Sequence, residues 1–494
     1  MKKRDKKSRI LIGSILFVLT FALVFFGVQW FTKTGFFRLP GVVYYDESLN
    51  DSELEVLATI FTDELELDRD VTVSAKNYLQ YPELNENDFL YNVFVPVTDF
   101  YSTGTNVTAD SSEILFSDSY ATENSFNMID VSELDFREKL LSINGEYYLD
   151  NYNNGAIFRV ISFDSKKYDE EIKPLVEQAF KKEYPSKKNV LTMAQTGVTA
   201  LSRAMNAKLD EVGDATYFSQ NLGEYLSSFD LTHTSNESSF SEYAYSGNIC
   251  SDPRFIDTLT AIGLDIVELT GNHNQDCGDE AALETIDIYN NNSIKIVGGG
   301  KTADEAAIPL QINEKGNGIT FLAYNLSTGG ATYDDTPGAN QYYEENAVDE
   351  IKKAKEQGNL VIVDIQYYEC SAYVATEEDT TCDYADSAAG DQIGFFRHLI
   401  DLGADIVVGT SAHQPQTFEL YGDGAIYYGL GNLFFDQAWW PGTTRSLVLE
   451  HYFYNNKLLQ TRINVTVYGS ELQTSLMFED MKNQFLERLI SERP

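Results

Sequence analysis

The chain has 494 residues, 43% of them hydrophobic, with 36 basic and 76 acidic side chains and a formal net charge of −40. The apolar content is enough for packed cores, which excludes a chain that is disordered throughout. The excess of anions excludes nucleic acid as a partner, because phosphate binding needs clustered cations. The acidic surface is typical of a soluble exterior protein, and sites for divalent cations are the alternative.

The chain begins with a strongly basic tail at 1–9, followed by an uncharged apolar run at 10–31. A helix of that length spans about 33 Å, which matches the hydrocarbon core of a bilayer. Because the cations precede the run, the sequence predicts a single transmembrane anchor with a cytoplasmic tail and an extracellular main body. A cleaved signal peptide is the alternative, although no small-x-small cleavage site follows the run.

Residues 41–185 are acidic and irregular, with islands of regular structure. The run at 92–102 predicts a buried strand that leads into a polar loop. Apolar residues spaced near 3.6 predict helices at 52–65, 132–143 and 168–185. We interpret this region as a separate N-terminal α/β module, with a seam at 186–189.

From residue 190 to 468, expected strands alternate with helices of about 10 to 15 residues. This alternation predicts a layered α/β domain, followed by a C-terminal extension at 469–494. The first strand is expected to turn at Gly197 and lead into a helix, and Asn455-Asn456 is expected to close an antiparallel hairpin. The other expected strands lie at 265–269, 295–300, 319–325, 360–369, 405–409 and 425–436, and the other helices at 252–264, 279–292 and 391–404.

The chain contains four cysteines, Cys250, Cys277, Cys370 and Cys382. An exported protein favours disulfides, and three pairings are open. The spacings favour Cys250–Cys277 and Cys370–Cys382, because each closes a modest loop. A four-cysteine zinc site is the alternative, but it lacks any Cys-x-x-Cys pair.

Polar side chains follow several of the expected strands in the second half of the chain. They are Asn236, Glu237, Asn272, His273, Glu369 and His413. Ligands of open α/β folds gather beyond the carboxyl ends of strands, so we expect these loops to meet in one pocket. Asn, carboxylate and imidazole groups are ligands for Mn, Zn or Fe, and an imidazole also serves as a general acid or base. The alternative is that Asn272 and His273 only satisfy the backbone of a turn.

Blocks in this half of the chain resemble a known family. They read ELTGNHNQDCG, KIVGGGKTADEA and GADIVVGTSAHQPQTFELYGDGAIYYGLGNLFFD, starting at Glu268, Lys295 and Gly403. In this order and spacing they resemble the CapA poly-γ-glutamate capsule-biosynthesis family, whose domain is similar to calcineurin-like metallophosphoesterases. The resemblance covers about 190–468, and a module at 41–185 similar to a periplasmic solute-binding protein would suit such a chain.

The resemblance carries over residue by residue, but not everywhere. The matching positions are Asn236, Glu237, Asn272, His273, His413, Gly431, Asn432 and Asp436. Three positions depart from the family pattern. Val198 stands where the family has a metal-binding Asp, Gln366-Tyr367-Tyr368 replaces a His-Trp-Gly strand end, and Thr410 replaces the first histidine of the late loop. These departures remove ligands from a two-metal centre.

The resemblance implies a membrane-anchored protein that synthesises, transfers or anchors an exported capsule polymer, with the membrane, the anionic polymer or capsule-synthesis proteins as partners. In a metal-assisted hydrolase or transferase, the catalytic residues would be Asn272, His273 and His413. The substrate-binding residues would be Arg203, Asn432 and Asp436, and one divalent ion would be held by Asn236, Glu237, Asn272, Glu369 and His413. A catalytically inactive scaffold that binds polymer or assembly partners is the alternative.

Overall fold

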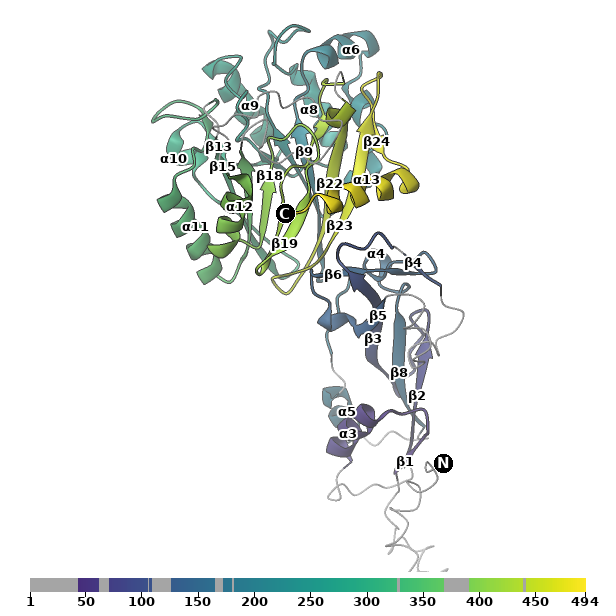
Figure 1. Ribbon diagram of the computed structural model, residues 1–494. Helices are drawn as coiled ribbons and strands as arrows, with labels where there is room; N and C mark the ends of the chain where they lie inside the picture. Colours follow the sequence, from purple (N-terminus) through teal and green to yellow (C-terminus); the bar gives the residue numbers. More distant parts are fainter. Residues whose placement is uncertain are drawn as a thin grey trace, which may run out of the picture. The chain divides into compact units, whose positions relative to one another are not determined.

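Figure 1 shows the computed structural model, which describes residues 43–61, 71–104, 106–108, 126–164, 172–179, 182–326, 329–367, 391–438 and 441–494. The expected tail and anchor at 1–31 lie outside these ranges. Within them, no helix has the length and apolar character needed to cross a bilayer. The chain divides into two compact units, Met1–Val93 with Ile157–Glu183, and Phe94–Ala156 with Tyr184–Pro494. Residues 94–156, which the sequence places in an N-terminal module, therefore group with the larger unit.

The smaller unit pairs a sheet with two helices. Its strands are β1 (Val43–Tyr45), β2 (Val71–Tyr78), β8 (Ile157–Asp164) and the first half of β3 (Asp88–Asp99), and its helices are α3 (Asp51–Ile60) and α5 (Ile172–Ala179). Helix α3 confirms the helix expected at 52–65, but it starts one residue earlier and its N-cap is Asn50, which forms a capping box with Glu53. The Glu53 carboxylate also accepts from Arg159 Nη2 at 2.7 Å in the buried interior.

The prediction of a helix at 132–143 is wrong. The structure instead has a single 3-10 turn, Val131–Glu133, and the short strands β6 (Glu138–Leu140) and β7 (Ser142–Ile143). Strand β6 pairs with the second half of β3, and β7 pairs with β4 (Asn106–Val107). Hydrogen bonds to partners distant in sequence therefore outweigh the helical spacing of the apolar residues.

The larger unit contains two mixed sheets. Among the described residues, the first runs β12-β11-β10-β9-β22-β23-β24, with β21 paired to β9, and the second runs β14-β15-β17-β18-β20-β19. The first comprises β9 (Leu191–Thr199), β10 (Leu231–Asn236), β11 (Ile266–Glu268), β12 (Lys295–Val297), β21 (Asn432–Phe434), β22 (Arg445–Tyr454), β23 (Lys457–Tyr468) and β24 (Thr474–Leu476). The second comprises β14 (Leu310–Glu314), β15 (Asn317–Asn325), β17 (Leu360–Gln366), β18 (Ile406–Gly409), β19 (Phe418–Tyr421) and β20 (Gly424–Tyr427). The expected layered α/β domain is thus present.

Apolar side chains from both sheets form one continuous core, so the two sheets pack face to face. Helices α6 (Ala204–Val212), α8 (Ile256–Ala261) and α9 (Asp279–Asn291) cover the outer face of the first sheet, and α11 (Glu344–Glu356) and α12 (Gln392–Asp401) cover the second. Helix α13 (Glu479–Ser491) places Phe485 and Leu489 in the shared core, so the C-terminal segment belongs to this unit.

Gly197 does not make the expected turn, because β9 continues through it to Thr199. A Cβ atom at Gly197 would lie 2.0 Å from the carbonyl oxygen of Gly431. The glycine is therefore needed for the close approach of β21 to β9 rather than for a change of chain direction. The hairpin at Asn455-Asn456 is confirmed, since both residues have positive φ angles, 51° and 57°.

The disulfide between Cys250 and Cys277 is also confirmed, with Cα atoms 6.1 Å apart. It joins the loop after β10 to the loop after β11. The expected partner pair, Cys370 and Cys382, lies outside the described residues.

A buried polar contact joins the two sheets. Asp364 on β17 accepts a hydrogen bond from Gln195 on β9 at 2.7 Å, and its other oxygen lies 3.0 Å from His233 Nε2 on β10. His451 on β22 continues the contact, with Nε2 3.2 Å from Gln195 Oε1 and Nδ1 2.9 Å from the Thr461 hydroxyl. Burial, with a smaller effect from His233, lowers the pKa of His451 to about 3, so this imidazole stays neutral.

Replacing Asp364 tests this contact. We expect Asp364→Ala to lower the free energy of unfolding by about 1–3 kcal/mol, because it leaves the buried polar groups of His233 and Gln195 without this partner. Urea denaturation of the full chain measures the change. Asp423→Ala is the control, because this exposed carboxylate pairs with Arg137 at the surface and its loss should leave the midpoint unchanged. Equal midpoints for both variants would contradict a stabilising role for Asp364.

Glu268, at the end of β11, gives the fold a dependence on pH. Its carboxylate is fully buried and accepts from the backbone N–H of Thr270 at 2.6 Å. Burial, assisted by the charge of Asp364, raises the pKa of Glu268 to about 7. The folded protein therefore keeps a proton on Glu268 at pH values where the unfolded chain has lost it.

The free energy of unfolding should therefore fall as pH rises from about 4.5 to about 7, by up to about 1.4 kcal/mol per pH unit from this group, and then level off. In Glu268→Gln this slope should disappear, because the amide does not ionise. Urea denaturation of both proteins at several pH values across that window gives the difference. Parallel curves for the two proteins would show that Glu268 does not carry the effect.

Candidate functional site

Residues from four strand ends meet in the larger unit. Glu237 follows β10, Asn272 follows β11, Gln366 ends β17 and His413 follows β18. Strands β9, β10 and β11 run parallel to one another, as do β15, β17 and β18, so the loops after them share one edge of each sheet. The sequence-based expectation that strand-end loops come together is met for Glu237, Asn272 and His413, whereas Gln366 was not among the expected residues.

Gln366 lies at the centre of this group. Its Nε2 donates to Asn272 Oδ1 at 2.9 Å and faces Glu237 Oε1 at 3.3 Å. One amide thus holds a carboxylate from the first sheet and a second amide from the neighbouring loop. The side chains of Gln366 and Glu237 are both fully buried, so their orientation is fixed by packing as well as by these hydrogen bonds.

His413 completes the group. Its Nδ1 lies 3.0 Å from Asn432 Oδ1, and its Nε2 lies 3.8 Å from Glu237 Oε2. Asn432 Nδ2 donates to Gln437 Oε1 and to the Thr443 carbonyl, both at 3.1 Å, which directs Asn432 Oδ1 toward the imidazole. Since a carbonyl oxygen only accepts, Nδ1 of neutral His413 carries the proton and Nε2 keeps its lone pair. The side chain of His413 is 12% exposed.

The backbone around these residues is tightly packed. A Cβ atom at Gly271 would lie 2.5 Å from Glu237 Cα, so only glycine allows the two loops to approach this closely. The backbone N–H of Glu237 donates to the Thr199 carbonyl at 2.9 Å, and Asn325 Nδ2 donates to the Thr270 carbonyl at 2.7 Å. The loops after β9, β10 and β11 are therefore held by each other.

Arg203, Asn432 and Asp436, predicted to bind substrate, lie next to this group. Asp436 accepts from Arg203 Nε and from the backbone N–H of Ala204, each at 2.8 Å. The Arg203 guanidinium lies 4.6 Å from the centre of the Phe435 ring, and the other neighbour of that ring is His413, at 5.2 Å between centroids. Arg203 and His413 thus contact the same aromatic ring, and Asp436 balances the charge of Arg203.

The remaining predicted residues are placed differently. His273 is partly exposed, and its described partner is Asp276, at 2.8 Å from Nδ1. Asn236 is buried, and its Nδ2 donates to the Ser238 carbonyl at 2.8 Å. Glu369 lies outside the described residues. The structure therefore joins Glu237, Asn272 and His413 in one contact group, and the catalytic roles of all predicted residues stay predictions.

Sequence reasoning treated Gln366 only as a departure from a family pattern, whereas the structure makes it the central donor of the site. A signal was available, because Gln366 is the last residue of an otherwise apolar strand, LVIVDIQ, and its amide stands at the strand end. Asp364 in the same strand was also missed, as was its partner His233.

The described residues do not fit a two-metal centre. Among them, no three His, Cys, Asp or Glu side chains come together as a group that could hold a metal ion. Glu237 and His413 are the two such side chains at the site, and the oxygens of Glu237 and Asn272 receive N–H groups from Gln366. Catalytic zinc sites use three protein ligands, and two-metal sites use more. The Gln366 amide nitrogen thus faces one oxygen of Glu237 and the side-chain oxygen of Asn272, both of which an ion would need as ligands.

Comparisons with known proteins match this region. The family described as "Bacterial capsule synthesis protein PGA_cap" matches residues 191–437, which is half of the chain. The capsule biosynthesis protein CapA of Bacillus anthracis is 23% identical over 275 residues, which cover 53% of this chain and 64% of the relative. The PGA biosynthesis protein CapA of Bacillus subtilis is 26% identical over 200 residues, which cover 40% of this chain and 49% of the relative. The match thus spans less than two thirds of each relative.

Among solved structures, a Staphylococcus aureus protein crystallised in complex with alpha-ketoglutarate aligns with a TM-score of 0.34 and 11% identity, covering 61% of this chain and 58% of the other. A likeness this weak decides nothing about the site. The family match contains every residue of the contact group described above, from Glu237 to Asn432. This chain belongs to the bacterial capsule synthesis protein PGA_cap family, as its resemblance to CapA proteins implied.

Proposed function

We propose that this protein is a membrane-anchored, extracellular member of a capsule-synthesis system that cleaves or transfers an exported anionic polymer of the poly-γ-glutamate type. The observation that carries the proposal is the contact group of His413, Glu237, Gln366 and Asn272 inside the region that the family model matches. Names of the relatives, which refer to capsule and PGA biosynthesis, support the class of polymer.

The chemistry rests on His413. Its Nε2 is the general base that takes a proton from the attacking group, either water or the amino end of another chain, at an amide carbonyl of the polymer. The same nitrogen then returns the proton to the leaving amine. Glu237 stabilises the imidazolium that forms between these steps, and Asn432 keeps the required tautomer. Asn272, oriented by Gln366, positions the carbonyl.

Binding of such an anionic substrate requires a cation close to the site. A body with an excess of acidic side chains repels a polyanion, so binding needs positive charge close to the reacting groups. Arg203 supplies that charge beside His413, and Asp436 fixes its position. No step of this mechanism passes through a metal ion. A single Mn, Zn or Fe ion bound with the help of Glu369 would be an alternative, and it has its own test below.

Localisation is part of the proposal. The apolar run at 10–31 with cations before it supports an anchor whose following residues lie outside the cell. The disulfide between Cys250 and Cys277 supports an oxidising exterior. Extracellular placement brings the site to the side of the membrane where an exported polymer would be met.

Replacing His413 tests the reaction. We expect His413→Ala to lower kcat for cleavage or transfer of poly-γ-glutamate by about 100- to 10,000-fold, because the general base is lost. New amino ends, measured with the full-length protein in detergent, give the rate. His398→Ala is the matched control, since this histidine is 44% exposed and pairs with Glu344 on the surface, and it should retain the wild-type rate.

Two outcomes would contradict the mechanism. The first is an unchanged rate in His413→Ala with the fold intact. The second is stoichiometric Mn, Zn or Fe in the purified protein that is lost in His413→Ala, because this would assign His413 to a metal rather than to proton transfer.

A non-catalytic scaffold is the second candidate function. Val198, Gln366 and Thr410 stand where the resemblance places metal ligands, which favours a retained fold without the ancestral chemistry. Cells carrying His413→Ala separate the two candidates. A changed amount or chain length of cell-associated polymer in these cells, with normal protein levels, is expected for the enzyme, whereas wild-type polymer would support the scaffold.

The anchor has a direct test. We expect the mature protein to keep residues 1–31 and to stay with the membrane fraction after carbonate washing, because a helix of about 20 apolar residues inserts stably. Sequencing of the mature amino terminus is the measurement. A mature terminus that begins after about residue 30 would show cleavage and would replace the anchor with a signal peptide.

A further inference from the structure

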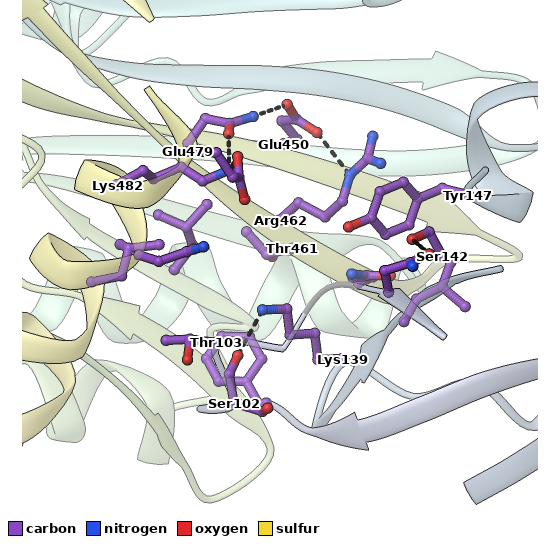
Figure 2. A pocket seen from close by; sticks show the side chains of 18 of the residues that line it. Ser102, Thr103, Lys139, Ser142, Tyr147, Glu450, Thr461, Arg462, Glu479 and Lys482 are labelled. Atoms are coloured by element: carbon purple, nitrogen blue, oxygen red, sulfur yellow. Dashed lines mark hydrogen bonds and ion pairs between the residues drawn. The ribbon is translucent and has the colours of Figure 1, made fainter. Parts of the chain in front are cut away.

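The larger unit contains a cavity of about 540 Å³ that shares no residue with the candidate site. Figure 2 shows its walls. The segment from Ser102 to Thr103 and strand β6 with Lys139 form one side, and β23 with Arg462 and helix α13 with Lys482 form the other. Apolar side chains close part of it, namely Phe100, Phe418, Leu486 and Ile490. The cavity therefore combines charged groups with an apolar wall, as ligand sites commonly do.

Two of the three cations that line the cavity are neutralised by carboxylates. Arg462 Nε lies 2.8 Å from Glu450, and Arg462 Nη2 lies 2.7 Å from Asp150. Lys482 Nζ lies 2.7 Å from Glu479. In a chain with about twice as many acidic as basic side chains, most cations are expected to pair with a carboxylate in this way.

Lys139 is different. Its Nζ donates to the backbone carbonyl of Ser102 at 2.6 Å and projects into the cavity. Within the part of the chain that the structure describes, no carboxylate lies at ion-pair distance from Lys139. Burial, together with the charge of Lys482, lowers the pKa of Lys139 to about 8. Glu479 offsets part of this effect, but a partly buried ammonium with no carboxylate at ion-pair distance is still costly, and a bound anion would offset that cost.

We propose that this cavity binds a small monocarboxylate with a short apolar stem, whose carboxylate pairs with Lys139. The hydroxyl of Ser102, which accepts from the backbone N–H of Gly104 and keeps its own hydrogen, is a further donor, and the apolar wall takes the stem. The ligand is a second molecule of the system rather than the substrate of the His413 group, since the two sites share no residue. This inference does not rest on the proposed function.

A phosphate fits the cavity less well. Phosphate sites favour a free arginine fork or a helix N-terminus. The Arg462 fork is occupied by Glu450 and Asp150, and the first turn of α13 carries Glu479 and Asp480. Those carboxylates repel a dianion more than a monoanion. One lysine with the Ser102 hydroxyl suits a single negative charge.

Calorimetric titration of the full-length protein in detergent tests the proposal. Butyrate is the probe, and we expect saturable binding with a Kd of about 1 mM, as befits so small a ligand. Butyramide, which has the same shape without the charge, should not bind, and inorganic phosphate should bind more weakly than butyrate. No saturable heat from butyrate, equal binding of butyramide, or a preference for phosphate would each overturn the proposal.

Two single substitutions test whether butyrate binding depends on Lys139. Lys139→Gln should weaken butyrate binding about 10- to 100-fold, because a charge-assisted hydrogen bond is lost. Lys301→Gln is the control, since this exposed lysine pairs with Asp287 outside the cavity, and it should bind like wild type. Unchanged affinity in Lys139→Gln would overturn the assignment.

A measurement on the wild-type protein makes the test independent of how Lys139→Gln folds. Near pH 8 the ammonium of Lys139 is only partly protonated, and a bound carboxylate raises its pKa. Butyrate binding should therefore take up protons, which shows as a dependence of the heat on the ionisation enthalpy of the buffer. The groups that face Lys139 are Glu479 and Lys482 of α13, Arg462 with Glu450 and Asp150, and Tyr147, whose pKa is raised by burial. Binding without proton uptake at this pH would contradict the role of Lys139.

Discussion

The contact of Asp364 with Gln195 and His233 is the constraint on which the site depends, because it fixes how the two sheets face each other. Side chains two residues apart on a strand point to the same side. Gln366 follows Asp364 by two residues on β17, and Glu237 follows His233 by four along the chain that leaves β10. The arrangement that brings Asp364 to His233 inside the core therefore brings Gln366 to Glu237 at the edge. The site is the outer end of the same inter-sheet contact.

The position of the site at the end of the inter-sheet contact explains its chemical character. Gln366 is a neutral donor that holds Glu237 and Asn272, where a metal-dependent relative would place ligands around an ion. The Gln366 amide orders the site, since one nitrogen faces an oxygen of Glu237 and an oxygen of Asn272. His413 is oriented by Asn432 through Nδ1, which places its Nε2 beside Glu237. Gln366, which stands where the resemblance places a metal ligand, thus takes part in a defined geometry around an imidazole.

Much of the larger unit could be predicted from sequence, because its strands are continuous apolar runs and its helices have clear periodicity. The loops carrying Asn272 and His413 were identified for the same reason, since strand ends of parallel sheets meet. The predictions from sequence failed where contacts between residues distant in the chain determine the local structure. The strands at Glu138–Leu140 and Ser142–Ile143 depend on partners far along the chain, and Gly197 is needed for the approach of Gly431 rather than for a turn. Gln366 was undervalued because its role comes from the facing sheet.

The carboxylate cavity and the base of the site are joined by buried hydrogen bonds. Thr461 lines the cavity, its hydroxyl contacts His451, and His451 contacts Gln195, the partner of Asp364. Contiguity of this kind does not by itself couple two sites, because coupling requires an element with two arrangements. Because the pKa of His451 is low, its imidazole stays neutral. This series of hydrogen bonds can therefore change the orientation of side chains but cannot transfer a charge. The route open to a ligand beside Thr461 is therefore the position of Gln195 and the sheet contact that Gln195 makes.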